Sequence, residues 1–387
     1  MKISKKDALE WFEFLSSLSE NKDNICLKYE EVIGSIFSQI EAAIDYRNNN
    51  LMSEIKNLKS LKNRTLFTGE ESKFPKGCHS CLLGNGLGAV RKTNKCNANC
   101  KFCYYYGELE KQRPIGEDMW EIGGTKFYEK DIDLLLSTCD KPSGIAYVYL
   151  EPFIEIEKYY SIIKKFNSAQ IHQHLYTNGI LATEKNLKAL GEAGLDEIRF
   201  NLGASECSDK VIENIKIAKK YIKYVGIETP MTPEFFNSFL AKKKSILETK
   251  LDFINCAELH LNDANVNNYI GENIYISREG YISPIWSREL TLKLMKIADE
   301  ENWELVVHDC SNDTKFARHL NLSNKLNLPF GSSTYEREFS EVPFEFFLPI
   351  LRNENFKFLN EEDLPSELKL KNIEENLNPP AILGRIE

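Results

Sequence analysis

The sequence has few features of exported or membrane-bound proteins. No run of apolar residues approaches the roughly 18 that a membrane-spanning helix needs. The N-terminal segment, residues 1–7, has neither the apolar stretch nor the cleavage pattern of a secretory signal. We therefore expect a cytoplasmic protein without a membrane partner, in which the ten cysteines are metal ligands, catalytic residues or core residues more often than disulfides.

Basic residues are outnumbered by acidic ones. Lys and Arg together number 49, against 58 for Asp and Glu, and the formal net charge is −9. Proteins that bind nucleic acids usually present a basic face, because neutralising phosphates drives their binding. The acidic total therefore argues against a nucleic-acid partner, although it says nothing about the fold.

Short apolar runs alternate with amphipathic segments from about residue 86 onward. The runs that resemble strands are Leu87–Lys95, Ile145–Glu151, His172–Thr177, Glu197–Leu202, Tyr224–Glu228, Phe253–Leu261 and Glu304–His308. The segments with helical spacing are Glu155–Phe166, Glu184–Ala193, Asp209–Tyr221, Pro233–Ile246 and Ser287–Glu301. This alternation predicts βαβ units and a parallel sheet. The fold class is therefore α/β, as a partial or full (β/α) barrel with its chemistry at the C-terminal ends of the strands.

Three regions follow from these patterns. Residues 1–73 carry apolar positions at helical spacing, among them Trp11 and Leu15, and predict a helical N-terminal extension. Residues 74–325 form the predicted barrel core together with a Cys-x2-Cys segment that precedes it. Residues 326–387 are rich in Pro, Asn and Glu and predict a C-terminal extension.

Three cysteines in one short loop give the strongest chemical signal. Cys96, Cys100 and Cys103 are spaced by four and three residues, directly after the first predicted strand. Thiolates are the ligands that iron–sulfur clusters take, and three of them on a four-iron cluster leave one iron open to a substrate or cofactor. Zinc sites usually pair Cys-x2–4-Cys units to reach four ligands, so zinc is the weaker interpretation.

The Cys-x3-Cys-x-aromatic-Cys pattern resembles the signature of the radical S-adenosylmethionine (radical SAM) superfamily. The resemblance covers roughly residues 74–320 and is greatest to a group related to the pyruvate formate-lyase activating enzyme. It implies a [4Fe-4S] cluster, SAM bound to the open iron, and a 5′-deoxyadenosyl radical that abstracts hydrogen from a peptide, a protein side chain or a small metabolite. It also implies a one-electron donor such as flavodoxin or ferredoxin.

The resemblance extends to the end of the second predicted strand. Tyr104 stands beside the third cysteine, where the family has an aromatic residue near the adenine. Glu151 and Pro152 match the end of a Gly-Gly-Glu-Pro stretch that holds the methionyl amino group in the family. Tyr149 and Leu150 replace the two glycines. The resemblance therefore makes Tyr104 and Glu151 cofactor-binding candidates.

Later strand ends supply further cofactor-binding candidates. Asn178 lies in a Tyr-Thr-Asn-Gly stretch that is frequent in the family. Asn201 stands where the family often has a polar contact to the ribose or carboxylate, and Arg199 would pair with a carboxylate. Glu228 lies in a stretch that resembles the strand flanking the adenine. The alternative interpretation for each of these residues is a structural polar group at a strand end.

Two further cysteines form a Cys-x2-Cys unit, a common half-site for zinc or an iron–sulfur cluster. Cys78 and Cys81 precede the first predicted strand, and Cys310 follows the last one. Together they are candidate ligands of a second, auxiliary iron–sulfur cluster, while structural zinc and metal-free thiols remain open as alternatives. For the three to meet, the segment with Cys78 would have to fold back over the barrel mouth.

Candidates for the substrate side come from the sixth predicted strand and a later loop. Strand alternation places Glu258, His260 and Asn262 on one face, with the last two nearest the mouth. If that face points inward, His260 and Asn262 are available for binding or proton transfer; if it points outward, they are only solvated. Arg288 ends a polar, aromatic loop that would line the same mouth.

Two classes of function fit these features. The first is an enzyme that cleaves SAM reductively and uses the radical on a substrate. The second is a non-catalytic iron–sulfur or zinc protein that carries electrons or acts as a scaffold. The C-terminal part lacks a dense cysteine series, and little chain lies beyond the barrel, which argues against large two-auxiliary-cluster maturases and cobalamin-dependent methyltransferases.

Overall fold

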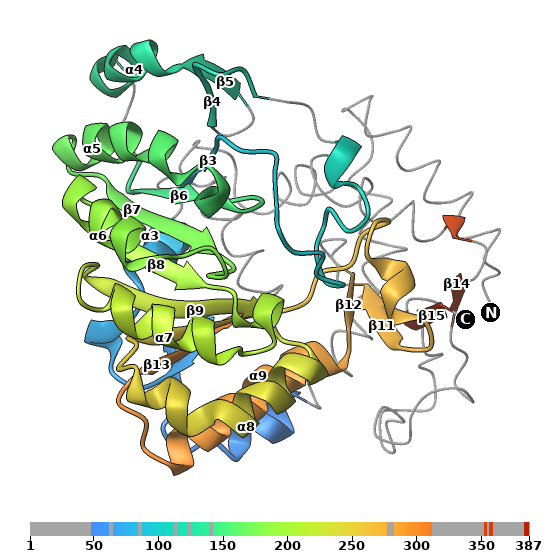
Figure 1. The fold of residues 1–387 in the computed structure, drawn as a ribbon. Coiled ribbons are helices and arrows are strands. Elements are labelled where there is room, and N and C mark those ends of the chain that lie inside the picture. The colour runs from blue at the N-terminus through green and yellow to red at the C-terminus, as the bar shows by residue number, and fades with distance from the viewer. Residues whose placement is uncertain are drawn as a thin grey trace, which may run out of the picture.

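A computed structural model describes residues 48–61, 65–83, 87–111, 115–122, 125–138, 142–276, 282–311, 352–353, 356–358 and 383–386 (Figure 1). The helices predicted within residues 1–47 lie outside the described residues, as does most of the predicted C-terminal extension.

Parallel strands form the centre of the main sheet. In chain order they are β3 (Leu87–Arg91), β6 (Gly144–Tyr147), β7 (His172–Thr177), β8 (Glu197–Phe200), β9 (Tyr224–Pro230), β10 (Phe253–Ala257) and β13 (Val306–Cys310). Each pairs in parallel with the next in this order. The α/β class is therefore confirmed, and all seven predicted strands are present, β7 with the predicted ends and the other six with shifted ends.

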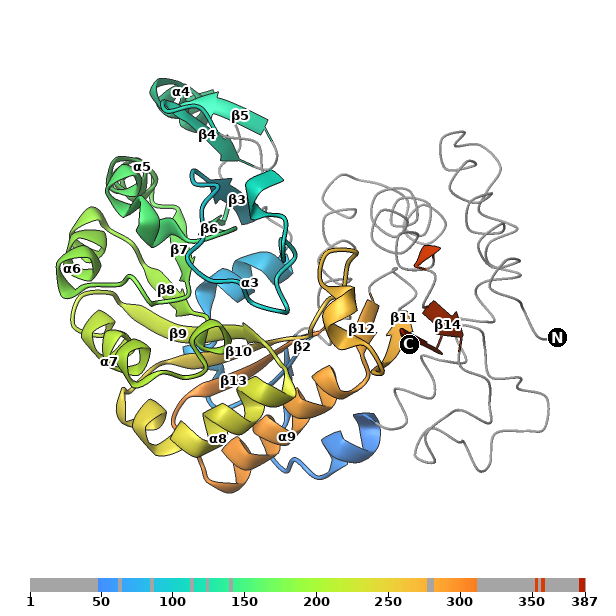
Figure 2. The same ribbon diagram turned by 45° about the vertical axis from the view of Figure 1, so that its right-hand side comes forward.

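The sheet is an open, curved one rather than a full barrel (Figure 2). On one side β3 pairs with antiparallel β4 (Met119–Ile122), which pairs with β5 (Thr125–Tyr128). On the other side β13 pairs with antiparallel β2 (Thr65–Thr68), which pairs with β1 (Lys59–Leu61). Both ends of the parallel run thus continue into antiparallel strands, so the partial form of the predicted barrel is the one observed.

Helices cover the convex face of the sheet (Figure 2). They are α5 (Tyr160–Ser168), α6 (Glu184–Ala193), α7 (Asp209–Ala218), α8 (Pro233–Glu248) and α9 (Trp286–Glu300), with the short α4 (Ile132–Thr138) beside β5. Hydroxyl residues begin three of them: Thr183, Ser208 and Thr232 each accept a hydrogen bond from the backbone N–H three residues later. Such caps satisfy N–H groups that the first helical turn leaves unpaired.

Short elements complete the described chain. The 3-10 helices are η1 (Glu71–Lys73), η2 (Leu109–Lys111), η3 (Glu129–Asp131), η4 (Pro152–Ile154), η5 (Ile156–Tyr159), η6 (Leu202–Ser205) and η7 (Val266–Tyr269). A second, antiparallel sheet has the order β12 (Ile282–Pro284), β11 (Asn273–Ile276), β15 (Leu383–Ile386) and β14 (Phe356–Phe358). Pairing of β15 with β11 ties a C-terminal segment to the core. Within the described residues, none of the helices has the length and hydropathy of a membrane span.

One helix lies on the concave side of the sheet and was not predicted. This is α3 (Lys76–Leu83), which carries the Cys-x2-Cys unit (Figure 2). Ser80 Oγ donates to the carbonyl of Ser143, directly before β6, at 3.3 Å, and Lys76 Nζ lies 5.6 Å from the ring centroid of Tyr224, the first residue of β9. The helix therefore fills the inside of the curve at the N-terminal ends of the strands.

Close packing of α3 requires a glycine at position 77. A Cβ atom there would lie 2.6 Å from both Arg199 Nη2 and His174 Nδ1. We expect Gly77→Ala to lower the free energy of unfolding by about 1–3 kcal/mol, because the side chains it meets are buried and have little room to move. Urea unfolding measures this, with His79→Ala, an exposed position of the same helix, as the control. Equal midpoints for the two variants would show that α3 does not pack against Arg199.

Candidate active site

The cysteine loop lies at the C-terminal end of β3, the end of the sheet where α/β enzymes have their chemistry. Two turns shape it. The N–H of Cys103 donates to the carbonyl of Cys100 at 2.9 Å, and the N–H of Tyr106 donates to the carbonyl of Cys103 at 3.1 Å. All three cysteines of the predicted motif are partly buried.

The three thiols are close enough to influence one another. Burial and the charges of Cys103 and Cys96 raise the pKa of Cys100 to about 12. Burial also raises the pKa of Cys96 and of Cys103. Three thiolates are therefore unfavourable here unless a positive group compensates for lost hydration and mutual repulsion. A cationic iron–sulfur cluster is such a group, and the donor set fits it.

Three asparagine side chains hold the backbone of the cysteine loop. The side-chain amide of Asn268 donates to the carbonyl of Lys101 at 2.9 Å, that of Asn265 to Phe102 at 3.1 Å, and that of Asn262 to Tyr104 at 3.1 Å. All three asparagines lie after β10, around η7. Because they fix carbonyls on both sides of Cys103, the segment after β10 sets the position of the third thiol.

Sequence reasoning assigned only Asn262 to the site, and to the substrate side. Its amide instead binds the cysteine loop, and its Oδ1 accepts from the N–H of Asn265 at 3.2 Å. The roles of Asn265 and Asn268 were missed. The density of asparagine between Asn262 and Asn268 was the available signal, since such side chains often bind nearby backbone groups.

Glu151 is a buried carboxylate that positions the ends of β6 and β7. Its Oε1 accepts from the N–H of Phe153 at 3.0 Å and from Thr177 Oγ1 at 2.8 Å, and its Oε2 accepts from the N–H of Asn178 at 2.7 Å. Burial raises the pKa of Glu151 to about 7, although these three hydrogen bonds lower it. Protein groups thus engage both oxygens.

Asn178 connects that carboxylate to the cysteine loop. Its backbone N–H binds Glu151, and its side-chain amide donates to Asn97 Oδ1 at 2.8 Å and lies 4.0 Å from Cys96 Sγ. The structure therefore places Asn178 beside the first cysteine, at the position where the sequence predicted a cofactor contact.

The backbone at Tyr149 and Leu150 has a left-handed conformation, with φ of 69° and 60°. These are the positions where the radical SAM stretch has two glycines, which adopt such angles without cost. For other residues the left-handed region costs roughly 1–2 kcal/mol each. The chain thus keeps a glycine-like backbone despite the substitutions. The Tyr149 ring is 45% exposed and lies 6.4 Å from that of Tyr105, a neighbour of the third cysteine.

Polar and aromatic residues continue along the same end of the sheet. Asn201 Oδ1 accepts from Thr229 Oγ1 at 2.8 Å and from the N–H of Ala204 at 3.2 Å, which joins the ends of β8 and β9. The rings of Tyr104 and His260 meet edge to face at 5.4 Å. His260 thus contacts Tyr104 beside the third cysteine, and Asn201 lies at the C-terminal end of β8; their cofactor- and substrate-side roles stay predictions.

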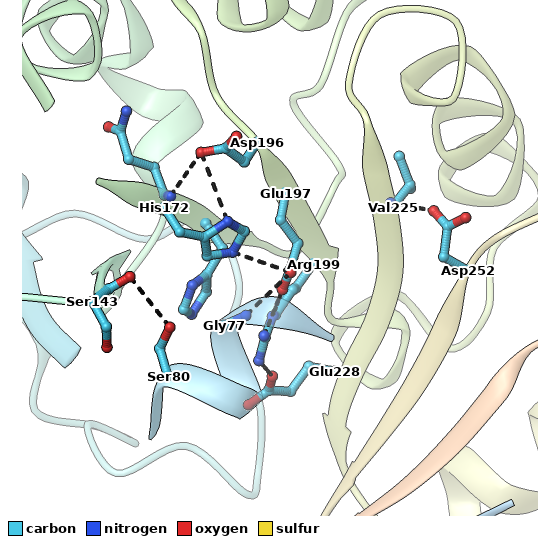
Figure 3. A network of polar contacts seen from close by, with 12 residues as sticks. Gly77, Ser80, Ser143, His172, Asp196, Glu197, Arg199, Val225, Glu228 and Asp252 are labelled. Atoms are coloured by element: carbon cyan, nitrogen blue, oxygen red, sulfur yellow. Dashed lines mark hydrogen bonds and ion pairs between the residues drawn. The ribbon is translucent and has the colours of Figure 1, made fainter. Parts of the chain in front are cut away.

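Arg199 and Glu228 lie deeper, inside the curve of the sheet (Figure 3). Arg199 Nε donates to Glu197 Oε1 at 2.6 Å, and its Nη1 donates to Glu228 Oε2 at 2.5 Å and to the Tyr176 hydroxyl at 3.1 Å. The alternation of β8 turns Glu197 and Arg199 to the same face. The structure thus pairs Arg199 with carboxylates of its own chain, so its predicted contact with a cofactor carboxylate is indirect at most.

Histidine and glutamate side chains surround the part of this network at the N-terminal ends of β7 and β8. Burial and the nearby Arg199 charge hold the pKa of His174 well below its usual range. Burial opposes ionisation of Glu197, yet the charge of Arg199 and a hydrogen bond with His172 hold the pKa of Glu197 below its usual range. Glu197 is therefore anionic and His174 neutral at neutral pH.

Cys78 is buried inside the curve of the sheet, where the charge of Cys310 still influences it. Burial raises the pKa of Cys78, Arg199 lowers it, and the charges of Glu228, Glu197 and Cys310 raise it further. The segment does not fold back over the barrel mouth as predicted: α3 carries Cys78 and Cys81 along the concave side of the sheet, because the open sheet leaves room for a helix there. Whether these thiols bind metal remains a prediction.

Arg288 does not belong to the loop predicted to line the mouth. It lies in α9, and its Nη2 is 3.5 Å from Asp309 Oδ2 on β13. The segment that was predicted to be a loop before Arg288 forms β12 and the start of α9 instead.

The left-handed backbone at Tyr149 gives a test of the strained turn. Tyr149→Gly should keep or slightly raise the free energy of unfolding, because glycine accepts this conformation. Tyr149→Val should lower it by about 1–2 kcal/mol relative to Tyr149→Gly, since β-branched residues rarely adopt positive φ. The comparison is made by equilibrium urea unfolding. If the two variants are equally stable, the turn is not left-handed in solution.

Comparison with protein-family models gave no match. Among curated proteins, the chain is 27% identical over 263 residues to a Methanocaldococcus jannaschii protein whose name provisionally describes a glycyl-radical enzyme activating enzyme. This covers 66% of the chain and 67% of that protein. An uncharacterised protein of the same organism is 26% identical over 145 residues, which is 35% of the chain and 44% of that protein.

Solved structures show weaker similarity. Streptococcus suis SuiB bound to precursor peptide SuiA has a TM-score of 0.39 and 12% identity, covering 63% of this chain and 52% of SuiB. Methylornithine synthase has a TM-score of 0.39 and 11% identity, covering 75% of this chain and 96% of that enzyme. At these scores the similarities say nothing about chemistry.

The curated relationship spans about two thirds of both chains. This similarity to a protein described as a glycyl-radical enzyme activating enzyme bears out the resemblance that the cysteine loop predicted, and the chain carries its three-cysteine loop at the end of a parallel sheet.

Proposed function

We propose that this chain is an enzyme that cleaves SAM reductively and uses the resulting radical to abstract hydrogen from a peptide or protein. The observation that carries the proposal is the cysteine loop, which three asparagines and the Glu151–Asn178 pair hold at the C-terminal ends of the strands. A rigidly held set of three thiols suits a cluster with one open iron.

Cys96, Cys100 and Cys103 would hold a [4Fe-4S] cluster. When bound, the cluster would supply one electron to SAM, whose C5′–S bond breaks to give methionine and a 5′-deoxyadenosyl radical that takes a hydrogen atom from the substrate. The residues of the chain bind and orient. Asn178 and Asn201 offer side-chain amides at neighbouring strand ends, and Tyr104 offers an aromatic face with 41% exposure.

Glu151 and Arg199 contribute through other residues. The Glu151 carboxylate fixes the backbone of Asn178, and Arg199 and Glu228 stabilise the inside of the sheet beneath the strand ends. They are positioning residues in this proposal. A flavodoxin or ferredoxin remains the expected one-electron donor.

A protein substrate is preferred over a small metabolite. The support is the name of the Methanocaldococcus jannaschii relative, since an activating enzyme of a glycyl-radical enzyme would abstract hydrogen from a glycine Cα of a partner protein. Because that relative is only 27% identical to this chain, we propose the class of the substrate, a partner protein, and not its identity. The exposed Tyr149 ring beside Tyr105 would face a peptide that approaches the loop.

Replacing the loop cysteines tests the chemistry. After anaerobic reconstitution, the chain with dithionite and SAM should form 5′-deoxyadenosine, and the Cys96→Ala, Cys100→Ala, Cys103→Ala triple variant should lose about four irons and all of this product. Cys207→Ala, at a buried thiol outside the loop, is the control. A wild-type cluster that neither binds nor cleaves SAM would favour the non-catalytic iron–sulfur alternative.

Replacing Asn265 tests how the loop is positioned. Asn265→Asp removes the amide that donates to Phe102 and to His260, and it places a carboxylate oxygen against two carbonyls. We expect iron retention and the rate of 5′-deoxyadenosine formation to fall about 10-fold or more, as for other groups that orient metal ligands. The matched control is Asn267→Asp, at an exposed position in the same segment. Equal iron content and rate in both variants would remove Asn265 from the site.

A further inference from the structure

We propose that His172, His174 and Glu197 form a binding site for a divalent transition-metal ion, with zinc as the best fit, at the N-terminal ends of β7 and β8. Figure 3 shows His172 and Glu197 pointing toward one another. The site lies at the opposite end of the strands from the cysteine loop. It does not depend on the proposed function.

The three side chains already converge to metal-binding distances. Their ligand atoms all lie within 4.8 Å of one another, and His172 Nε2 is 3.4 Å from Glu197 Oε2. Zinc bonds of about 2.0–2.1 Å in a tetrahedral site keep two ligand atoms about 3.4 Å apart. One pair therefore has the required spacing, and small rotations of side chains bring in the third.

Strand geometry explains the convergence. His172 and His174 are two residues apart on β7, so they lie on one face, and His174 pairs in register with Glu197 on parallel β8. Imidazole and carboxylate are common zinc ligands, and three protein ligands leave a fourth position for water.

Two buried histidine nitrogens are available to the proposed ion. In the described part of the chain, His174 Nδ1 has no hydrogen-bond partner, and the contact of His172 Nε2 is with Glu197 Oε2 at 3.4 Å, the other proposed ligand. His174 is fully buried, and leaving such an atom unpaired costs roughly 1–3 kcal/mol. Coordination of a metal ion would use both nitrogen lone pairs.

Each ligand has an outer partner that orients it. His172 Nδ1 lies 3.8 Å from Asp196 Oδ2, His174 Nε2 lies 3.3 Å from the Tyr176 hydroxyl, and Glu197 Oε1 accepts from Arg199 Nε at 2.6 Å. Metal-binding histidines almost always give their other ring nitrogen such a partner, which fixes the ring and its tautomer.

The charge of Arg199 does not exclude a cation. Two carboxylates, those of Glu197 and Glu228, pair with this one guanidinium, and a third, that of Asp196, lies beside His172, which leaves the cluster with a net charge of −2. A divalent ion would neutralise it. Arg199 also engages Glu197 through Oε1, so Oε2 remains directed at His172.

The ion would have a structural role. The N-terminal ends of barrel strands usually serve stability rather than catalysis. Gly77, near the start of α3, donates its N–H toward Glu197 Oε2 at 3.5 Å and packs against His174. An ion bound there would link β7 and β8 beneath α3, the helix that carries Cys78 and Cys81.

Metal analysis of the full chain tests the proposal. Protein stripped with a chelator is titrated anaerobically with Zn²⁺, and bound zinc is measured after gel filtration. Co²⁺ is then used as a spectroscopic probe, because nitrogen and oxygen ligands give weak visible bands without the intense near-ultraviolet absorption of cobalt–thiolate bonds. We expect about one tightly bound zinc per chain, and a thiolate-free cobalt spectrum for this site.

Variants separate this site from the cysteines. His172→Ala should weaken zinc binding at least 10-fold, and Asp196→Asn should weaken it about 10–100-fold through loss of the orienting carboxylate. His172 lies at the edge of the network, with 12% side-chain exposure, so its variant should fold. The control His79→Ala alters an exposed histidine of α3 and should bind as the wild type does.

The same titrations can overturn the proposal. Unchanged zinc binding in His172→Ala and Asp196→Asn would contradict it. So would zinc that is lost in Cys78→Ala and gives a cobalt–thiolate spectrum, since that metal would belong to the cysteines of α3. The absence of any tightly bound zinc, cobalt or iron outside the cysteine loop would also contradict it.

Discussion

Parallel pairing of the central strands is the constraint on which the rest of the structure depends. In a parallel sheet every C-terminal strand end lies at one edge, so loops that are distant in sequence must meet there. The cysteine loop after β3, Glu151 after β6, Asn178 after β7 and the asparagines after β10 are brought together in this way. Their hydrogen bonds then fix the loop backbone.

The asparagine contacts show how such a loop gains precision. A loop with three cysteines has no regular structure to hold its carbonyls, and each carbonyl needs a donor when partly buried. Side-chain amides from one segment supply donors for Lys101, Phe102 and Tyr104. The thiols, which repel one another as thiolates, are therefore held in place by neutral groups that add no charge to the site.

The inside of the sheet is unusually polar for a protein core. Arg199 is 2% exposed and is bound by two glutamates and a tyrosine hydroxyl, with histidines below it and Cys78 beside it. An unpaired buried guanidinium would be very costly, so these partners are interdependent. The open edge of the sheet admits α3 into this space. The polar interior thus joins the strands to a helix that carries potential metal ligands.

Much of the fold could be read from the sequence because its signals are local. Glu184–Ala193 forms a helix as predicted, since its apolar spacing and the Thr183 cap are short-range features, and His172–Thr177 forms a strand for similar reasons. By contrast, α3 was missed. An eight-residue segment containing Gly77 and two cysteines has little helical signal of its own, and its contacts with the sheet stabilise it.

The sequence by itself determined the parallel α/β class, the cysteine loop and the resemblance to radical SAM enzymes, because periodicity, residue spacing and short motifs are properties of contiguous segments. Only the tertiary structure decided that Asn265 and Asn268 hold that loop, that Arg199 and Glu228 satisfy each other inside the sheet, and that His172, His174 and Glu197 converge. These contacts join residues on different elements. Strand register and the curvature of the sheet set their distances, and neither is encoded in any single stretch of sequence.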